Sequence, residues 1–461
     1  MTLKYLFSSL ILLLSFPLFS QSQGYEIKIN TKKNINKKII LANYYNSKVY
    51  SIDTAKLLNP KQAVFNGNKK LPSGLYVIIL SKNKYYDLFI GKDQTIDIDI
   101  DSTINIRNSK ESIAFKKYED FLQEINNKKR SIIMENRPKK ALLRKKLQEL
   151  DVLVRNELAD INKQFPNTSL VNFINFSVGI KIPDYNNSVD KNIKNRKQII
   201  NKKIYNYNKK HFWDNANLSD STLIRTPILR RKLDLFFKRI LPQDADTISK
   251  YAIQLIEKTK NNKSSFRYIT SYSYNYCLRN KYMGMDKAYY NIAKKYYASK
   301  KAYWISDSSY LKIKSNLNLM KYSFIGMKAK NLKMQNIDGE IVDLHNIKAP
   351  LTILIFWEPD CGLCKEEVPA LNKLLNTKYK NSGIKVFSVY TLNNKQKWIE
   401  FIENHNLYNF INCYDPFLTS KFHLYYNIKQ TPMIFLLDKN KKIIAKKINT
   451  ATLDMIIKDY L

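Results

Sequence analysis

The spacing of apolar positions changes character twice along this chain. Up to about residue 107, short runs such as 25–29 and 96–101 alternate apolar and polar residues, and turn residues separate the runs. Such alternation predicts strands with one buried face, so we expect a small antiparallel β-rich sandwich or sheet over 24–107. From 109 to 320 glycine is almost absent and apolar positions recur at helical spacing, which predicts a mainly helical domain.

The last third of the chain alternates strands and helices. A β-hairpin is expected over 325–344, followed by a buried strand at 351–357 and a helix that places Val368 and Leu371 on one face. The other expected elements are strands at 384–390, 410–414, 433–437 and 442–445, and helices around 398–402, 417–426 and 451–461. This alternation, with a terminal hairpin, predicts an α/β layer fold for a C-terminal domain over 323–461.

The N-terminus has the pattern of a secretory leader. Lys4 precedes an apolar stretch from Leu10 to Leu18, and small or polar residues follow at 20–22. We therefore expect a signal peptide over 1–22 and an exported protein of the periplasm or cell envelope. The stretch is short for a membrane span, and an uncleaved leader that tethers the protein is the alternative.

The chain is strongly basic, with 78 Lys and Arg against 39 Asp and Glu and a net charge of +39. The lysines are spread over the whole sequence and are not gathered within a nucleic-acid-binding module, so we expect no nucleic-acid partner. The alternating carboxylates Asp97, Asp99 and Asp101 are expected on the solvated face of a strand. A calcium site is the less favoured alternative, because calcium loops hold their ligands on a tight turn that contains glycine.

Four cysteines are too few for an exported scaffold built on disulfides. Cys277 and Cys413 are most simply small buried residues, although a bridge between them stays open. Cys361 and Cys364 form a CxxC pair at a predicted strand-to-helix turn. There, unpaired N–H groups and the helix dipole would lower the pKa of Cys361, and Cys364 lies one turn away, close enough to close a disulfide. The sequence thus predicts a redox pair.

Two other interpretations of the CxxC pair were weighed. In the first, the two cysteines supply half of a zinc site. Structural zinc needs four ligands, however, and the chain has no second CxxC and only four scattered histidines. An inert, buried pair is the other. We expect no metal and no organic cofactor.

Several features around the pair carry a family resemblance. Phe356-Trp357 precedes the CxxC, Pro369 lies within the following helix, and Thr431-Pro432 precedes an apolar strand. Together with the hairpins, they resemble the thioredoxin superfamily, specifically the exported TlpA-like thiol–disulfide oxidoreductases. The resemblance implies a cis bond before Pro432, a structural role for Pro369, and substrate binding by Trp357, Thr431 and Pro432.

The preceding regions also look familiar. The segments 211–214 and 283–286 resemble a helical region of unknown function found in exported proteins of Bacteroidota. The β-rich N-terminus resembles a small domain often found ahead of that region. These resemblances imply one architecture over nearly the whole chain and no activity for its first two domains.

The pair departs from thioredoxin at several neighbouring positions. Ile355 stands where thioredoxin has a buried carboxylate, Asp360 where it has tryptophan, and Leu363 where it has proline. Because like charges repel, Asp360 is expected to raise the pKa of the first cysteine. Glu358 and Glu366 are candidate proton-transfer groups, with solvated carboxylates of the turn and the first helical turn as the favoured alternative.

These features together predict an enzyme, a periplasmic thiol–disulfide oxidoreductase. Cys361 would attack a protein or small-thiol disulfide and Cys364 would resolve the mixed disulfide, in the reducing direction, with electrons from a membrane relay. One rival is a thiol peroxidase, although such enzymes place threonine where this chain has Glu358. The other is an envelope binding protein whose first two domains hold a partner, with a regulatory or incidental redox pair.

Overall fold

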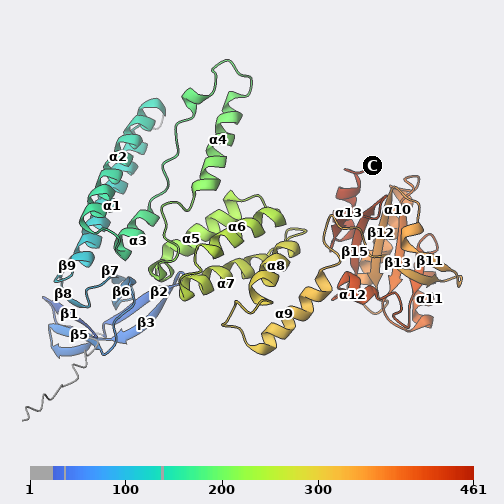
Figure 1. Ribbon diagram of the computed structural model, residues 1–461, viewed down its shortest axis with the longest axis horizontal. Coiled ribbons are helices and arrows are strands. Elements are labelled where there is room, and N and C mark those ends of the chain that lie inside the picture. The colour runs from blue at the N-terminus through green and yellow to red at the C-terminus, as the bar shows by residue number, and fades with distance from the viewer. Residues whose placement is uncertain (1–23, 36–37, 137–139) are drawn as a thin grey trace, which may run out of the picture. The chain divides into compact units, whose positions relative to one another are not determined.

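The computed structural model describes residues 24–35, 38–136 and 140–461. These residues fall into two compact units, one ending at Asp234 and the other beginning at Leu235. Helices and strands of both units are labelled in Figure 1.

The predicted signal peptide at 1–22 lies outside the described residues. Within the described part of the chain, no helix is long and apolar enough to cross a membrane. The division between the two units falls inside the helical region predicted at 109–320.

The first unit begins with a β-sandwich, which confirms the predicted β-rich region. Its two sheets have the strand orders β4-β5-β1-β8-β9 and β3-β2-β6-β7, and both contribute to one apolar core. The strands are β1 (Tyr25–Thr31), β2 (Ile40–Tyr45), β3 (Lys48–Thr54), β4 (Lys56–Asn59), β5 (Gln62–Gly67), β6 (Gly74–Ser81), β7 (Lys84–Ile90), β8 (Thr95–Ile100) and β9 (Ile104–Arg107).

One pairing in this sandwich differs from the expected antiparallel arrangement. Strands β1 and β8 run parallel, with Ile27 opposite Ile96 and Ile29 opposite Ile98. All four isoleucines are fully buried. Alternation reports which face of a strand is buried but not the direction of its neighbour, so the sequence pattern could not predict this parallel pair.

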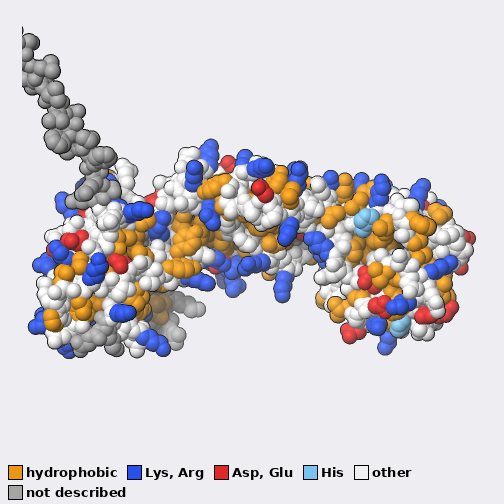
Figure 2. Space-filling view, turned by 90° about the horizontal axis from the view of Figure 1, so that it is seen from below, with side chains coloured by type: hydrophobic (Ala, Val, Ile, Leu, Met, Phe, Trp, Pro, Cys, Tyr) orange, Lys and Arg blue, Asp and Glu red, His pale blue; other side chains and the backbone are white. Residues whose placement is uncertain are grey.

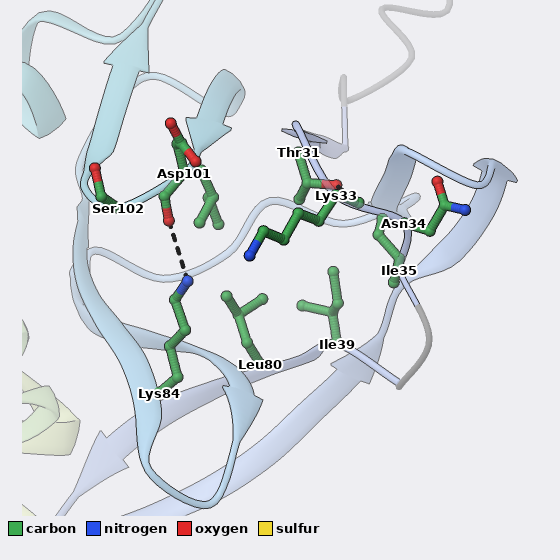
Figure 3. A pocket seen from close by; sticks show the side chains of 10 residues that line it. Thr31, Lys33, Asn34, Ile35, Ile39, Leu80, Lys84, Asp101 and Ser102 are labelled. Atoms are coloured by element: carbon green, nitrogen blue, oxygen red, sulfur yellow. Dashed lines mark hydrogen bonds between the residues drawn. The ribbon is translucent and has the colours of Figure 1, made fainter.

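A pocket of 490 Å³ opens where several strands of the sandwich end (Figure 3). Ile39 and Leu80 line it with apolar surface, and Lys33 and Lys84 lie beside them. The Lys84 ammonium donates to the backbone oxygen of Asp101 over 3.1 Å. The described residues that line the pocket include no cysteine and no histidine.

Helices cover the sandwich and complete the first unit. Phe89 of β7 packs against Phe115 and Phe173, with ring centroids 6.0 and 5.9 Å apart, and so joins the sheet to two helices. The helices are α1 (Lys110–Asn136), α2 (Lys140–Gln164), α3 (Ser169–Ser177), η1 (Asn186–Ser188), α4 (Arg196–His211), η2 (Ser221–Arg225) and α5 (Pro227–Leu235), which reaches the boundary.

The second unit opens with an aromatic helical region, as the pattern predicted. Tyr274 stacks on Tyr297 with ring centroids 4.2 Å apart. The helices are the π-helix η3 (Phe236–Ile240), α6 (Ala245–Glu257), α7 (Lys263–Arg279), α8 (Asp286–Ile292), the π-helix η4 (Ala293–Tyr297) and α9 (Asp307–Met320).

A seven-stranded sheet with helices on both faces forms the rest of the second unit (Figure 1). The strand order is β11-β10-β14-β13-β12-β15-β16, with β12, β13 and β14 parallel. Helices α10, α11 and α13 share the core of one face, and α12 that of the other. The elements are β10 (Lys333–Asn336), β11 (Ile341–Asp343), η5 (Leu344–Asn346), β12 (Leu351–Trp357), α10 (Gly362–Thr377), β13 (Lys385–Tyr390), α11 (Lys395–Asn404), β14 (Ile411–Tyr414), α12 (Phe422–Tyr426), β15 (Met433–Asp438), β16 (Ile443–Lys446) and α13 (Thr450–Ile457). The predicted α/β fold is confirmed.

The helix expected at 417–426 is shorter than predicted. Its first half is a loop in which both carboxylate oxygens of Asp415 accept hydrogen bonds, from the backbone N–H and hydroxyl groups of Thr419 and Ser420. Because the carboxylate takes these N–H groups, the chain turns here, and the helix begins only at Phe422.

A buried ion pair joins the helical region to the edge of the sheet. The ammonium of Lys446, on β16, lies 2.5 Å from an Asp286 carboxylate oxygen and donates to the backbone oxygen of Ser323. Burial lowers the pKa of Lys446, and Asp286 opposes that change. The helical region and the sheet are therefore fixed to each other at this point of the second unit.

The partly buried carboxyl of Asp87 makes the stability of the first unit depend on pH. Burial, and after it the nearby Glu119, raise the pKa of Asp87 to about 6, while Tyr44 donates to it over 3.5 Å. A carboxyl with a raised pKa in the folded state stabilises the fold most when protonated. The stability it contributes is lost as the pH rises from about 4 through 6.

We therefore expect Asp87→Asn to stabilise β7 against unfolding by about 2 kcal/mol at pH 7.5 and by little at pH 4. Hydrogen exchange of β7 at both pH values, corrected for intrinsic rates, measures this difference. Asp151→Asn removes a carboxylate whose side chain is 61% exposed and is the control. An equal gain at both pH values would contradict the assignment.

Candidate active site

The reactive pair lies where the most buried strand of the sheet ends. All seven residues of β12 are buried, between β13 on one side and β15 on the other. The polar turn Glu358-Pro359-Asp360 cannot continue this strand, and α10 begins at Gly362 with Cys361 as its N-cap. The chain thus brings Cys361 to the end of the parallel strands, where α/β folds usually place their sites.

The two thiols of the pair lie in different environments. Cys361 is partly exposed, Cys364 is fully buried, and both are free thiols. The backbone N–H of Cys364 donates to the sulfur of Cys361 over 3.3 Å, and the Cys361 thiol donates to the backbone oxygen of Thr431 over 3.2 Å. Cys361 is therefore the thiol that a substrate can reach.

The surroundings move the pKa values of the two thiols in opposite directions. Burial disfavours the Cys361 thiolate, but hydrogen bonds with Cys364, with the Thr431 side chain and with the backbone of Leu363 outweigh burial and lower the pKa of Cys361. Burial, and after it the hydrogen bond with Cys361, raise the pKa of Cys364 to about 12. The exposed sulfur is therefore the more readily ionised of the two and the better nucleophile, whereas the buried one stays a thiol.

Asp360 has a partner that the sequence did not predict. It pairs with Lys397 of α11 at 2.7 Å, which lowers the pKa of Asp360. The pKa of Cys361 is lowered overall, because its hydrogen bonds outweigh the effect of burial. An adjacent cation offsets the carboxylate charge that was expected to oppose the thiolate.

The Thr431-Pro432 peptide bond is cis, as the resemblance implied. It follows a loop from α12 and leads into β15, and its threonine carbonyl faces Cys361. The structure thus brings Cys361, Thr431 and the cis-proline together, as the sequence predicted.

Trp357 occupies a different place from the predicted one. Its side chain is fully buried and its Nε1–H donates to the Ser388 hydroxyl over 2.7 Å. A buried indole cannot touch a substrate, so this placement corrects the expected binding role. Trp357 instead supports the end of β12 from within the core.

The two candidate proton-transfer residues are placed unequally. Glu358 accepts a hydrogen bond from the Thr391 hydroxyl over 2.7 Å, and its backbone is hydrogen-bonded to the Cys364 thiol. Glu366 is exposed on the first turn of α10. Neither carboxylate is hydrogen-bonded to a cysteine sulfur within the part of the chain that the structure describes. Ile355, where thioredoxin has its buried carboxylate, is fully buried among apolar residues.

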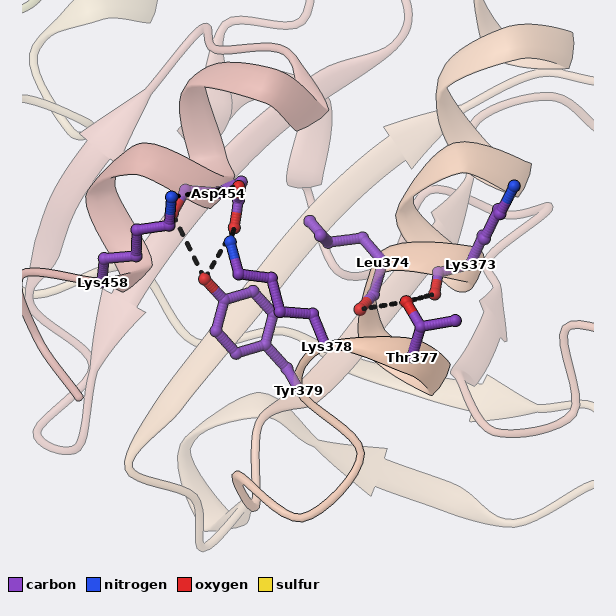
Figure 4. Close-up of polar contacts among 7 residues, drawn as sticks. All are labelled: Lys373, Leu374, Thr377, Lys378, Tyr379, Asp454 and Lys458. Atoms are coloured by element: carbon purple, nitrogen blue, oxygen red, sulfur yellow. Dashed lines mark hydrogen bonds and ion pairs between the residues drawn. The ribbon is translucent and has the colours of Figure 1, made fainter.

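Three hydrogen bonds in and just after α10 could not be predicted from the sequence. Glu367 accepts from the backbone N–H of Thr450, where α13 begins. At the other end, Asp454 of α13 accepts from Lys378 at 2.5 Å and from Tyr379 at 2.7 Å (Figure 4). These bonds connect residues 75 or more positions apart, so no local sequence pattern predicts them. They hold α10, which continues through Pro369, against α13.

The described residues show no group of three or more His, Cys, Asp or Glu side chains that could hold a metal ion. Cys277 and Cys413 are both free and buried, so the bridge left open by the sequence is not formed. Burial raises the pKa of each to about 12, which makes both poor nucleophiles.

Lys397 provides a direct test of this electrostatic arrangement. Lys397→Gln removes the cation beside Asp360, so we expect the pKa of Cys361 to rise by a few tenths, roughly the effect of an exposed charge near the sulfur. The pH dependence of iodoacetamide alkylation measures it. Adding Asp360→Asn to Lys397→Gln removes the freed carboxylate too and should restore the original pKa. An unchanged pKa in Lys397→Gln would contradict this role.

Three segments of the chain match known families. Residues 325–446 match the AhpC/TSA family, residues 200–323 match a domain of unknown function (DUF5106), and residues 25–115 match another (DUF4369).

Individual relatives match the same C-terminal segment. A protein of Bacillus cereus named thiol-disulfide oxidoreductase ResA is 26% identical over 132 residues, which is 29% of this chain and 74% of the relative. A solved domain of a possible thiol-disulfide isomerase from Cytophaga hutchinsonii is 33% identical and is covered to 95%, against 30% of this chain, with a TM-score of 0.28.

A thioredoxin-like protein from Bacteroides caccae matches a longer part of the chain. It is 21% identical and covered to 99%, against 61% of this chain, with a TM-score of 0.44. On these matches, residues 325–446 form a domain of the AhpC/TSA family that is similar to thiol–disulfide oxidoreductases, and it follows two domains of unknown function.

Proposed function

We propose that this protein reduces disulfides of exported substrates in the periplasm, through Cys361 and Cys364. The observation that supports this most is the asymmetry of the pair. One thiol is partly exposed with a lowered pKa, and the other is buried with a raised pKa one helical turn away. Thiol–disulfide exchange needs this division between an attacking and a resolving sulfur.

The first step is attack by the Cys361 thiolate on one sulfur of the substrate disulfide. A bond forms between Cys361 Sγ and that sulfur, the substrate S–S bond breaks, and the second substrate sulfur leaves as a thiolate that takes a proton. The thiol that donates to Thr431 in the resting site loses this bond as it ionises. The backbone N–H of Cys364 then remains as a donor to the sulfur.

The second step releases the substrate. Cys364 loses its proton and attacks Cys361 Sγ, the mixed disulfide breaks, and the substrate leaves with both its sulfurs reduced. The substrate has gained two electrons and two protons, and the pair has become a disulfide. With a pKa raised to about 12, Cys364 needs a proton acceptor. We assign this to Glu358 ahead of Glu366, because Glu358 lies in the turn beside the Cys364 thiol, whereas Glu366 is exposed on the first turn of α10.

Substrate would dock beside the cis-proline. The backbone of Thr431 next to cis-Pro432 can pair with an extended segment, as an added strand does at a sheet edge. Such pairing recognises main chain, so it suits a protein disulfide better than a small thiol.

The compartment and the electron source belong to the same proposal. The leader predicted at 1–22 supports export, and an uncleaved leader would tether the protein to the membrane. Because the periplasm is kept oxidising, each turnover needs a reductant that restores the dithiol, which we assign to a membrane electron relay.

A binding function of the first two domains is the second candidate. The pocket of the sandwich, with its apolar lining and nearby lysines, supports binding without chemistry. It would coexist with redox activity in the C-terminal domain.

Trapping tests the redox proposal. Because Cys364→Ser removes the resolving sulfur, we expect mixed disulfides through Cys361 to accumulate with envelope proteins, identified by mass spectrometry of non-reduced complexes. The Cys361→Ser, Cys364→Ser double variant is the matched control and should trap nothing. Failure of Cys364→Ser to trap any partner, with no reduction of an added disulfide by the wild type, would overturn the proposal. Consumption of peroxide through Cys361 would point to the peroxidase instead.

A further inference from the structure

The loop of residues 427–432, here called the cis-proline loop, meets the attacking sulfur at Thr431. It runs from the end of α12 to the start of β15, and its Thr431 carbonyl accepts from the Cys361 thiol. A substrate segment that pairs with Thr431 must therefore pass beside the side chains that precede Thr431 in this loop.

Lys429 of this loop is held in place by the helical region. Its ammonium donates to the Asn316 side-chain oxygen of α9 over 2.5 Å, and the Asn316 amide donates to the Met320 sulfur. Nearby, Tyr322 packs edge-on against Tyr425 of α12 with ring centroids 5.4 Å apart. Helix α9 thus packs beside the cis-proline loop and holds the ammonium of Lys429 in place.

Lys447 places a second cation beside β15, the strand into which the cis-proline loop leads. Its backbone N–H donates to the oxygen of Ile434, two residues after Pro432. The preceding residue is Lys446, whose buried pair with Asp286 anchors this end of β16. Lys447 has positive φ, so its exposed side chain leaves the regular path of the strand.

Negative charge is scarce around the ammonium groups of Lys429 and Lys447. Partial burial, and after it Lys447, lower the pKa of Lys429, so the two cations repel each other. Within the described residues, no carboxylate lies within 4.0 Å of either ammonium. The oxygen of Asn316 is a neutral partner for Lys429 and leaves its charge in place. An anion between these cations would relieve the repulsion.

Abundance of lysine alone does not explain this arrangement. Lysine and arginine side chains are scattered over the face seen in Figure 2, as the composition predicts. Lys429 and Lys447 differ from the other lysines because α9 holds Lys429, which belongs to the loop that meets the reactive sulfur, and Lys447 is bonded to the strand that follows this loop.

We propose that Lys429 and Lys447 form an anion subsite beside cis-Pro432, and that the preferred substrates are protein disulfides with Asp or Glu near the cysteine. This inference rests on the proposed thiol–disulfide exchange and adds the substrate class to it. Helix α9 takes part through Asn316, which gives the helical region a role in specificity.

The test uses the prereduced full-length protein in single turnovers with three disulfide peptides. The peptides share one sequence and differ only in two positions beside the cysteine, occupied by Glu, Gln or Lys. We expect the second-order rate constant for the Glu peptide to exceed that for the Lys peptide by about three- to tenfold at low salt, since two exposed ion pairs are worth this much. The ratio should fall towards one at high salt.

Two sets of variants locate the effect. Lys429→Gln with Lys447→Gln should abolish the preference, whereas Lys385→Gln with Lys439→Gln should keep it. The latter pair removes the same charge at the opposite end of β13 and β15. Asn316→Asp sets a carboxylate against Lys429 and should weaken the preference. The Cys361 alkylation rate reports whether the variants keep an intact site.

The results distinguish the anion subsite from the exchange reaction. Equal rates for the three peptides in the wild type would overturn the anion subsite and leave the exchange reaction standing. The same holds if the remote pair of variants reduces the preference as much as the pair at the loop. Failure to reduce any peptide would overturn the exchange reaction, and the subsite with it.

Discussion

The exposure and hydrogen bonding of Cys361 and Cys364 depend on where strand β12 ends. An all-apolar strand in the middle of a sheet can bury seven side chains only while its backbone groups pair with both neighbours. Glu358-Pro359-Asp360 ends that pairing, and the next N–H groups belong to the first turn of α10. Cys361 receives their hydrogen bonds, whereas Cys364, one turn on, points into the core. One junction thus produces an attacking thiolate and a buried resolving thiol.

The surrounding elements hold this junction from three sides. Contacts of Glu367 and Asp454 fix α10 on α13, and Lys397 of α11 pairs with the acidic residue before the nucleophile. The cis-proline loop faces the sulfur from the side of β15. The same loop is attached to α9, so a change in the helical region has a direct physical path to the substrate-binding edge of the redox site.

The sequence could predict those features that depend on a few neighbouring residues. The buried strand, the CxxC turn and the Thr-Pro bond are encoded within a few residues, and the structure places them as expected. The partner of Asp360 lies 37 positions away, and whether Trp357 faces solvent depends on β13 and α11 packing over it. Long-range pairs such as Lys446 with Asp286, and the parallel pairing of β1 with β8, likewise depend on tertiary packing. The sequence pattern alone does not predict these contacts.

The central claim is that Cys361 ionises more readily than the other three cysteines, and site-resolved alkylation tests it most directly. The reduced, full-length protein is treated briefly with limiting iodoacetamide at pH 6.5, where an ordinary thiol of pKa about 8.5 is almost entirely protonated. Mass spectrometry then assigns the label among the four cysteines, with the urea-unfolded chain as reference. Our account predicts labelling of Cys361 alone in the folded protein and of all four cysteines at similar rates in urea. Labelling of Cys364 as fast as Cys361, or of Cys361 no faster than in urea, would contradict it.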